Sequence, residues 1–144
     1  MIEAAKLHGI SLTEAETMGK PHIGAEYKGG SGYVRTSDVC AICGRPATNV
    51  HHIGRRLTFT FVPNDKRAFI MRSALIALCG SGTTGCHGAV HAGRIKIRWK
   101  WDSEEASDKW WSGELIHECG QHSEKLYEYG CWQIETPEGT KEIR

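Results

Sequence analysis

The chain has 144 residues, of which 40% are hydrophobic and 24% are charged, and its formal net charge is +1. These are ordinary values for one globular domain, so they exclude extended disorder and make two full hydrophobic cores unexpected. No run approaches the roughly 18 apolar residues that a membrane span needs. Residues 1–16 carry early acidic side chains and no apolar core before a cleavage site. We therefore expect no secretory signal and a reducing, cytoplasmic location.

The expected secondary structure begins with a short helix over residues 3–18, where apolar side chains recur at helical spacing. Residues 28–33, which read Lys-Gly-Gly-Ser-Gly-Tyr, predict a flexible linker. The next expected elements are strands at residues 48–53, 58–62 and 69–78, and a two-turn helix at residues 86–92 that ends at Gly93.

Residues 94–101 alternate strictly between cationic and apolar side chains, which is typical of a half-buried strand. Its isoleucine and tryptophan face would pack on the core, and its cationic face would place charges about 7 Å apart. A solvated edge strand protected by charge is the alternative. Residues 102–144 contain apolar clusters without a sharp motif, and we expect an irregular or helical extension there.

Charge is segregated along the chain. Residues 40–100 contain 10 basic side chains and one acidic side chain, a net charge of +9, whereas residues 101–144 have a net charge of −7. A strongly basic block favours polyanions such as nucleic acid, and ordinary solvated surface is the alternative. The side chains expected to contact phosphates are Arg55, Arg56, Arg72, Arg94, Lys96, Arg98 and Lys100.

Four cysteines occur in two pairs that could complete one tetrahedral zinc site. Cys40 and Cys43 form a C-x-x-C knuckle, and Gly44 allows the turn to close. Cys79 and Cys86 are separated by Gly-Ser-Gly-Thr-Thr-Gly instead of the usual two residues, but these glycines let the loop bend back. The pattern therefore predicts a structural Zn²⁺. Cys119 and Cys131 lack such spacing and predict buried apolar packing.

Four histidines occur in two tight pairs near these cysteines. His87 and His91 are four residues apart, so on a helix they share one face and can bind one cation. His51 and His52 are adjacent, so on a strand they point to opposite sides. One of them can then join the metal while the other remains free to act as a base.

The order of these residues resembles the HNH endonucleases, also called ββα-metal or His-Me finger nucleases, in their bacteriophage and prophage form. The resemblance covers residues 38–93 and rests on three segments: Cys40-x-x-Cys43, Val50-His51-His52-Ile53, and Leu78-Cys79 continued by Cys86-His87-x-x-x-His91. It implies an α+β fold with a small zinc-stabilised ββα-metal core at 38–93. An N-terminal arm and Gly-rich linker at 1–37 precede this core, and the basic strand and acidic C-terminal extension at 94–144 pack on it.

The resemblance implies metal-dependent hydrolysis of DNA phosphodiester bonds, by nicking or double-strand cleavage, in phage DNA packaging or recombination. It makes His52 the general base. It assigns His51, His87 and His91 to the catalytic divalent metal, which would be Zn²⁺, Ni²⁺, Mn²⁺ or Mg²⁺. Three neutral nitrogen ligands suit Zn²⁺, Ni²⁺ and Mn²⁺ better than Mg²⁺. The structural Zn²⁺ falls to Cys40, Cys43, Cys79 and Cys86. The implied partners are DNA and the phage terminase, in the host bacterial cytoplasm.

One position departs from the family. HNH proteins usually have Asn five residues before the third cysteine, where its side chain holds the loop that orients the base. This chain has Ala74 at that position. Ser73 and Asn64 are the candidates to take over the role of the missing Asn. Ala74 supports the alternative of a non-catalytic, zinc-stabilised accessory protein that binds DNA or terminase, the acidic residues 102–144 docking on the partner. A disulfide-stapled secreted domain is a third interpretation.

Overall fold

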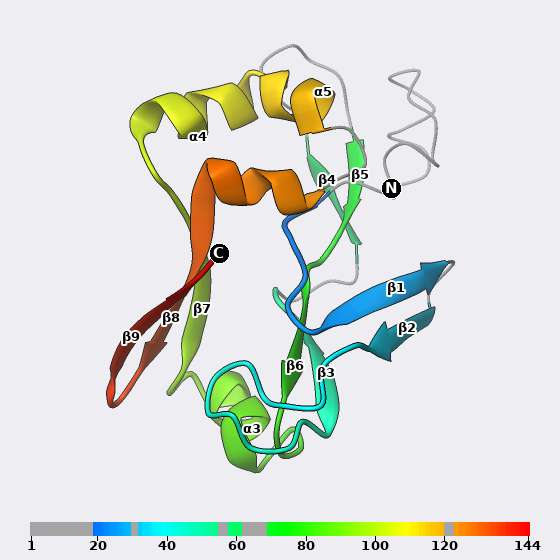
Figure 1. Cartoon of the computed structure of the whole chain (residues 1–144), viewed down its shortest axis with the longest axis vertical. Helices are drawn as coiled ribbons and strands as arrows, with labels where there is room; N and C mark the ends of the chain where they lie inside the picture. The colour runs from blue at the N-terminus through cyan, green and yellow to red at the C-terminus, as the bar shows by residue number, and fades with distance from the viewer. Residues whose placement is uncertain (1–18, 30–31, 55–57, 62–68, 120–122) are drawn as a thin grey trace. The chain divides into compact units, whose positions relative to one another are not determined.

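The computed structural model describes residues 19–29, 32–54, 58–61, 69–119 and 123–144. Its elements combine short helices with antiparallel strand pairs, so the fold is mixed α+β. In chain order (Figure 1) they are β1 (Ala25–Gly29), β2 (Gly32–Arg35), β3 (Asn49–His52), β4 (Thr58–Phe61), β5 (Phe69–Arg72), β6 (Leu75–Leu78), α3 (Gly85–His91), β7 (Lys96–Trp101), α4 (Glu104–Trp111), α5 (Glu114–Cys119), the 3₁₀ helix η1 (Ser123–Glu128), β8 (Gly130–Thr136) and β9 (Gly139–Ile143).

The chain divides into two compact units, each assembled from several segments. What we call the cysteine–histidine unit consists of His22–Ile53, Ala74–Trp99 and Trp132–Arg144. The helical unit consists of the described residues within Met1–Pro21, Gly54–Ser73 and Lys100–Cys131. Both units are discontinuous in sequence, whereas the domain boundaries expected from the sequence, 1–37, 38–93 and 94–144, are continuous; those boundaries stay a prediction.

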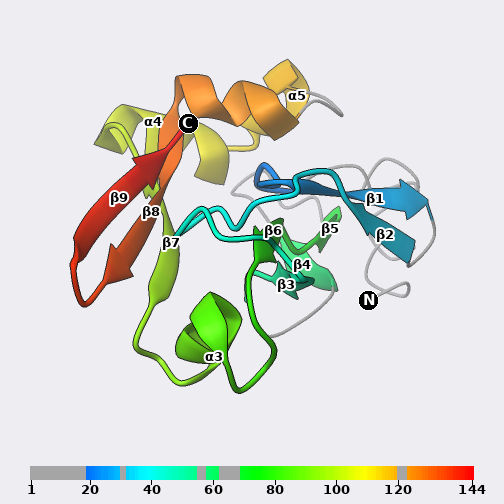
Figure 2. The same ribbon diagram turned by 60° about the horizontal axis from the view of Figure 1, so that its bottom comes forward.

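Strand β6 is the centre of the cysteine–histidine unit. It pairs antiparallel with β3, so that His51 lies opposite Ile76 and His52 opposite Leu75. Along its other edge Ile23 forms a parallel bridge, with its N–H 2.7 Å from the Leu75 carbonyl oxygen. All four residues of β6 are buried, which accounts for its uninterrupted apolar sequence. Helix α3 follows this strand pair in the chain (Figure 2).

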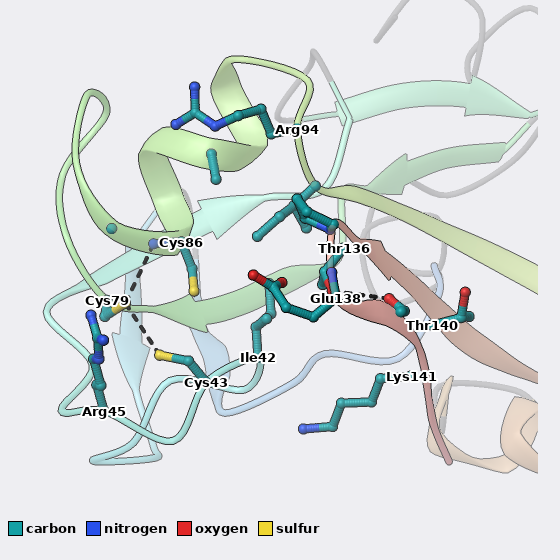
Figure 3. A pocket seen from close by; sticks show the side chains of 15 residues that line it. Ile42, Cys43, Arg45, Cys79, Cys86, Arg94, Thr136, Glu138, Thr140 and Lys141 are labelled. Carbon is teal, nitrogen blue, oxygen red and sulfur yellow. Dashed lines mark hydrogen bonds between the residues drawn. The ribbon is translucent and has the colours of Figure 1, made fainter.

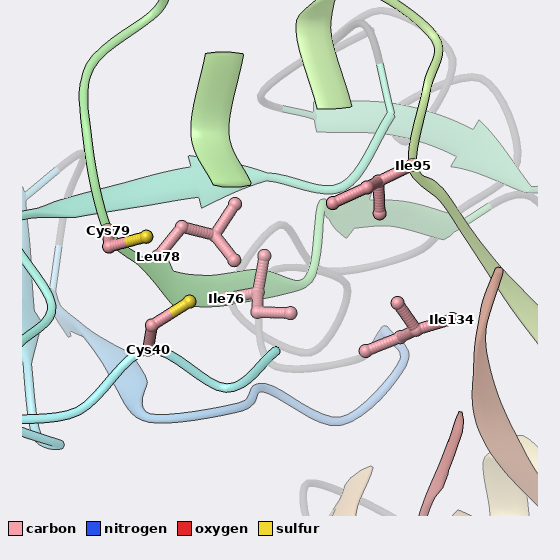
Figure 4. Close-up of a cluster of buried hydrophobic side chains, with 6 residues drawn as sticks. All are labelled: Cys40, Ile76, Leu78, Cys79, Ile95 and Ile134. Atoms are coloured by element: carbon pink, nitrogen blue, oxygen red, sulfur yellow. The ribbon is translucent and has the colours of Figure 1, made fainter. Parts of the chain in front are cut away.

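A small hydrophobic cluster stabilises this unit and includes two of the paired cysteines (Figure 4). The sulfur atoms of Cys40 and Cys79 approach each other beside the side chains of β6. The buried members of the cluster are Cys40, Ile76, Leu78, Cys79, Ile95 and Ile134. Because apolar burial stabilises by only about 25 cal/mol per Å², a cluster of this size leaves room for a metal to contribute much of the folding energy.

The segment expected to be a flexible linker forms a hairpin instead. β1 and β2 pair antiparallel, with Tyr27 opposite Tyr33 and Gly29 opposite Gly32. The aromatic and β-branched residues on either side of the glycines favour strands, which accounts for the hairpin. The helix expected over residues 3–18 lies outside the described residues.

The apolar run at 69–78 forms two strands rather than the single one expected. β5 pairs with β4, and β6 pairs with β3, so the run changes partners at Ser73 and Ala74. Both of these residues are buried, and the Ala74 carbonyl accepts a hydrogen bond from the Ile53 N–H at 2.8 Å. The strands expected at 48–53 and 58–62 and the helix expected at 86–92 are confirmed, each within two residues of its bounds.

The basic strand predicted at 94–101 is confirmed as β7, with exposed and half-buried residues alternating along it. Beyond it the C-terminal extension is more regular than expected, since β8 and β9 join β7 in a three-stranded sheet. In the helical unit, the Ser103 hydroxyl caps α4 by accepting from the Ala106 N–H at 3.1 Å. Trp110, on the same helix, is buried against Phe61, with ring centroids 4.8 Å apart. No helix within the described ranges is long and apolar enough to span a membrane.

Candidate metal centre and histidine cluster

The first cysteine pair occupies a tight turn that backbone hydrogen bonds close. The Gly44 N–H donates to the Cys40 carbonyl at 3.0 Å, and Gly44 adopts a φ of 77° that favours glycine. The Ala41 N–H donates to the Ala77 carbonyl on β6 at 3.0 Å, which fixes the knuckle to the buried strand. The C-x-x-C spacing thus places both thiols on one side of the turn.

The second pair spans a longer loop that folds back on itself. Ser81 and Thr84 form an isolated antiparallel bridge, and the His87 N–H donates to the Cys79 carbonyl at 3.1 Å. Gly80 has a φ of 83°, and a Cβ there would lie 2.1 Å from the Thr84 carbonyl oxygen. Only glycine fits this approach, so the unusual six-residue spacing is accommodated by the loop's composition.

The two pairs bring four sulfur atoms together. One ligand atom from each of Cys40, Cys43, Cys79 and Cys86 lies within 4.8 Å of all the others. The Sγ atoms of Cys43 and Cys79 are 3.5 Å apart (Figure 3), close to the roughly 3.8 Å between sulfurs in a tetrahedral site with Zn–S bonds of about 2.3 Å. The cluster could hold a structural metal ion such as zinc, as its spacing predicts. We call it the cysteine cluster.

The ionisation of these thiols also fits a cation. Burial opposes ionisation of Cys40, but hydrogen bonds from neighbouring backbone groups, first that of Cys43, outweigh it and lower the Cys40 pKa to about 7. Burial raises the pKa of both Cys43 and Cys86. Four thiolates this close would repel one another, so metal binding would displace protons from the thiols.

Three histidines form a second group, which we call the histidine cluster. His51 from β3 and His87 and His91 from α3 place one nitrogen each within 4.8 Å of one another. The Nε2 atoms of His87 and His91 are 3.0 Å apart, near the roughly 3.3 Å between nitrogens in a tetrahedral site with Zn–N bonds of about 2.0 Å. The i, i+4 spacing on α3 and the strand position of His51 bring them together, as the sequence predicts.

Two of these imidazoles, those of His51 and His87, are held in the neutral form that binds metal ions. The pKa of His51 is lowered to about 4, first by burial and then by the neighbouring His87 and His91. Burial, with a smaller contribution from His91, also lowers the pKa of His87. At neutral pH a lone pair on each of these two rings is therefore available to a cation.

His52 points away from the histidine cluster. Its ring lies 5.1 Å from that of Tyr33 and 6.4 Å from that of Tyr27, whereas the His51 ring lies 5.2 Å from that of His87. This opposition follows from the period of two in a strand. Burial lowers the pKa of His52, so it too is neutral at pH 7. The roles assigned to these histidines from the sequence stay predictions.

The candidate phosphate-binding residues have varied positions. Arg94, Lys96, Arg98 and Lys100 are exposed on and beside β7, and Arg72 is half-buried at the end of β5. Arg55 and Arg56 lie outside the described residues. In the cysteine–histidine unit, Arg94 also lines a cleft of about 600 Å³ that borders the cysteine cluster (Figure 3). Arg45 and Lys141 line the same cleft, together with the acidic Glu138.

Sequence reasoning missed the aromatic surroundings of His52. Tyr27 and Tyr33 are a cross-strand pair of the hairpin that was expected to be a linker. Two tyrosines flanking a short glycine-containing loop are a hairpin signal, and it could have revealed the pair.

Comparison of the chain with protein-family models, with curated proteins and with solved structures finds no match.

Proposed function

We propose that this chain is a metal-dependent DNA endonuclease of the HNH type. One observation carries the proposal: three imidazoles from a strand and a helix converge within 4.8 Å, and a fourth, His52, stands on the opposite side of the same strand. The antiparallel β3–β6 pair with α3 following β6, together with a cysteine cluster that could hold structural zinc, supports this proposal.

The residues of the histidine cluster fit a divalent cation. His51, His87 and His91 would hold it through neutral nitrogens, a donor set that suits Zn²⁺, Ni²⁺ or Mn²⁺ better than Mg²⁺. When bound, the ion would stabilise the negative charge that develops on phosphate oxygens during cleavage. At least one cluster member is exposed, so a substrate phosphate can approach.

His52 would act as the general base. A neutral imidazole has one nitrogen with a free lone pair, and that nitrogen accepts the proton of the attacking water. A positioned base contributes a factor of roughly 10²–10⁴ to the rate. The exposed cations of β7, namely Lys96, Arg98 and Lys100, would bind phosphates along the DNA backbone without reading its sequence.

A non-catalytic accessory protein that binds DNA or terminase is the second candidate, and Ala74 favours it. Its methyl group is buried and can form no hydrogen bond of the kind an Asn would offer there. In this alternative the cysteine cluster stabilises the fold and the histidines have a structural role.

Nicking of supercoiled plasmid by the purified chain tests the proposal. Conversion to the open-circular form should require a divalent ion, stop with a chelator, and fall by roughly 10²–10⁴-fold in His52→Ala. His117→Ala, on α5 of the helical unit, is the matched histidine control. Metal-dependent cleavage by His52→Ala within about threefold of wild type would overturn the assigned base, and plasmid binding without cleavage would favour the accessory role.

A further inference from the structure

The hairpin β1–β2 holds a tyrosine pair against the candidate base. Tyr27 and Tyr33 are directly opposite each other across the hairpin, so their side chains emerge on the same face. The ring centroids of Tyr33 and His52 are 5.1 Å apart and the ring planes are at 85°, an edge-to-face arrangement. The ring centroid of Tyr27 lies 6.4 Å from that of His52. Two aromatic rings thus fix the orientation of His52.

A series of contacts through β6 links Tyr27 back to His52. Leu75 is the register partner of His52, and its N–H donates to Nδ1 of His22 at 2.9 Å. The His22 ring in turn packs edge to face on Tyr27 at 5.3 Å. The position of Tyr27 relative to His52 is therefore set by the same strand that pairs with His52.

One nitrogen of His52 requires an explanation. Nε2 is shielded from solvent and has no hydrogen-bond partner among the described residues. A shielded lone pair there would meet the negative face of an aromatic ring unfavourably, whereas an N–H directed at that face is attracted to it. The rings of His52 and Tyr33 are nearly perpendicular, with centroids 5.1 Å apart, and this arrangement accommodates such an N–H against the face of Tyr33.

We propose that the Tyr27–Tyr33 pair is a positioning device that sets the tautomer of His52: the proton resides on Nε2, against the face of Tyr33, and Nδ1 keeps the lone pair that accepts a proton from water. Neutral imidazole tautomers are selected by what the other nitrogen contacts, so the hairpin decides which nitrogen is the base. The catalytic consequence rests on the proposed function, whereas the tautomer itself does not.

The first test is the tautomer in the zinc-loaded full chain. Long-range ¹⁵N–¹H correlation spectra at neutral pH distinguish a protonated Nε2 from a protonated Nδ1, and His52→Gln assigns the signal by its disappearance. We expect the wild-type chain and Tyr33→Phe, which keeps the aromatic face, to show the Nε2–H form. Tyr33→Leu should show both tautomers. A wild-type His52 with its proton on Nδ1 overturns the proposal without any variant.

The second test is kinetic. Tyr33 is 43% exposed, so Tyr33→Leu should keep the zinc content and thermal unfolding of the wild type. Loss of base orientation should lower kcat by about 10- to 100-fold with KM unchanged, and Tyr33→Phe should restore kcat. A raised KM with unchanged kcat would make Tyr33 a substrate contact and overturn its positioning role. If the wild-type chain cleaves no DNA, the proposed function fails, and the spectra alone then decide the tautomer.

Discussion

The cysteine cluster and the histidine cluster lie in the same unit but are built in opposite ways. Three of the cysteines lie outside the helices and strands, Cys86 lies in the first turn of α3, and two of the four are buried in the hydrophobic cluster. The histidines come from a regular strand and helix, and none of the three is fully buried. Closed, four-ligand sites are typical of structural metals, whereas three protein ligands with an open approach are typical of catalytic ones. Under the proposed function, the cysteine cluster would therefore supply stability and the histidine cluster would supply the chemistry.

Breaking the cysteine cluster should have the largest effect. Structural zinc sites contribute about 10–16 kcal/mol of binding energy, comparable to or larger than the roughly 5–15 kcal/mol that stabilises a whole domain. Cys79→Ser should lose zinc and unfold the cysteine–histidine unit, as checked by elemental analysis and circular dichroism. The control is Cys119→Ala, a buried cysteine of the helical unit, which should keep its zinc. Full zinc retention in Cys79→Ser would contradict the division of roles.

Breaking the histidine cluster should remove activity but not the fold. His87→Ala deletes one of three ligands, so we expect plasmid cleavage to fall at least about 100-fold because transition-state charge is no longer stabilised. Elemental analysis should show one bound metal per chain where the wild type, saturated with Zn²⁺, shows two. An unfolded His87→Ala chain would mean that this cluster, too, is structural.

A substitution in the loop between Cys79 and Cys86 tests whether the geometry of that loop contributes to the stability of the cysteine cluster. Gly80→Ala forces a side chain into positive φ and against the Thr84 carbonyl, so unfolding should require at least about 1–3 kcal/mol less free energy. Urea denaturation of the zinc-loaded chain measures this loss. Gly82→Ala is the matched control, since nothing described lies within 4 Å of its added Cβ. Equal stability of the two variants would contradict the strained-loop account.

The smallest expected effect concerns the basic face of β7. Each phosphate contact contributes about 0.9 to the slope of log affinity against log salt, so Lys96→Ala with Arg98→Ala should reduce that slope by about 2. Fluorescence anisotropy with duplex DNA at several salt concentrations measures it. Lys125→Ala, an exposed lysine of η1, should leave the slope unchanged. An unchanged slope in the double variant would place the DNA elsewhere.

Spacing predicted both clusters because each depends on short-range periodicity. Two histidines four residues apart share a helix face, and a C-x-x-C turn aligns its thiols whatever the rest of the chain does. The alternation of β7 was equally readable, since period two fixes its exposed face. These features need no knowledge of partners distant in sequence.

Partner choice is what the sequence did not reveal. Residues 69–78 are mostly apolar on both sides of Arg72 and Ser73, and this pattern does not show that β5 and β6 pair with different strands. The glycines at 29–32 favour a linker or a turn equally well, and the packing of Tyr33 on His52 decides between them. The β8–β9 pair was missed because its residues show no strict alternation.

Cys86 and His87 are neighbours on the first turn of α3, yet each belongs to a different cluster. Under the proposed function, metal binding at the cysteine cluster would anchor the start of α3, from which His87 projects, so the cysteine cluster would be loaded before the histidine cluster. An oxidant or chelator that removes the metal from the cysteines would then also make the position of His87 less fixed. The proposed activity would then be absent until the cysteine cluster holds its metal, and it would be lost whenever that metal is removed.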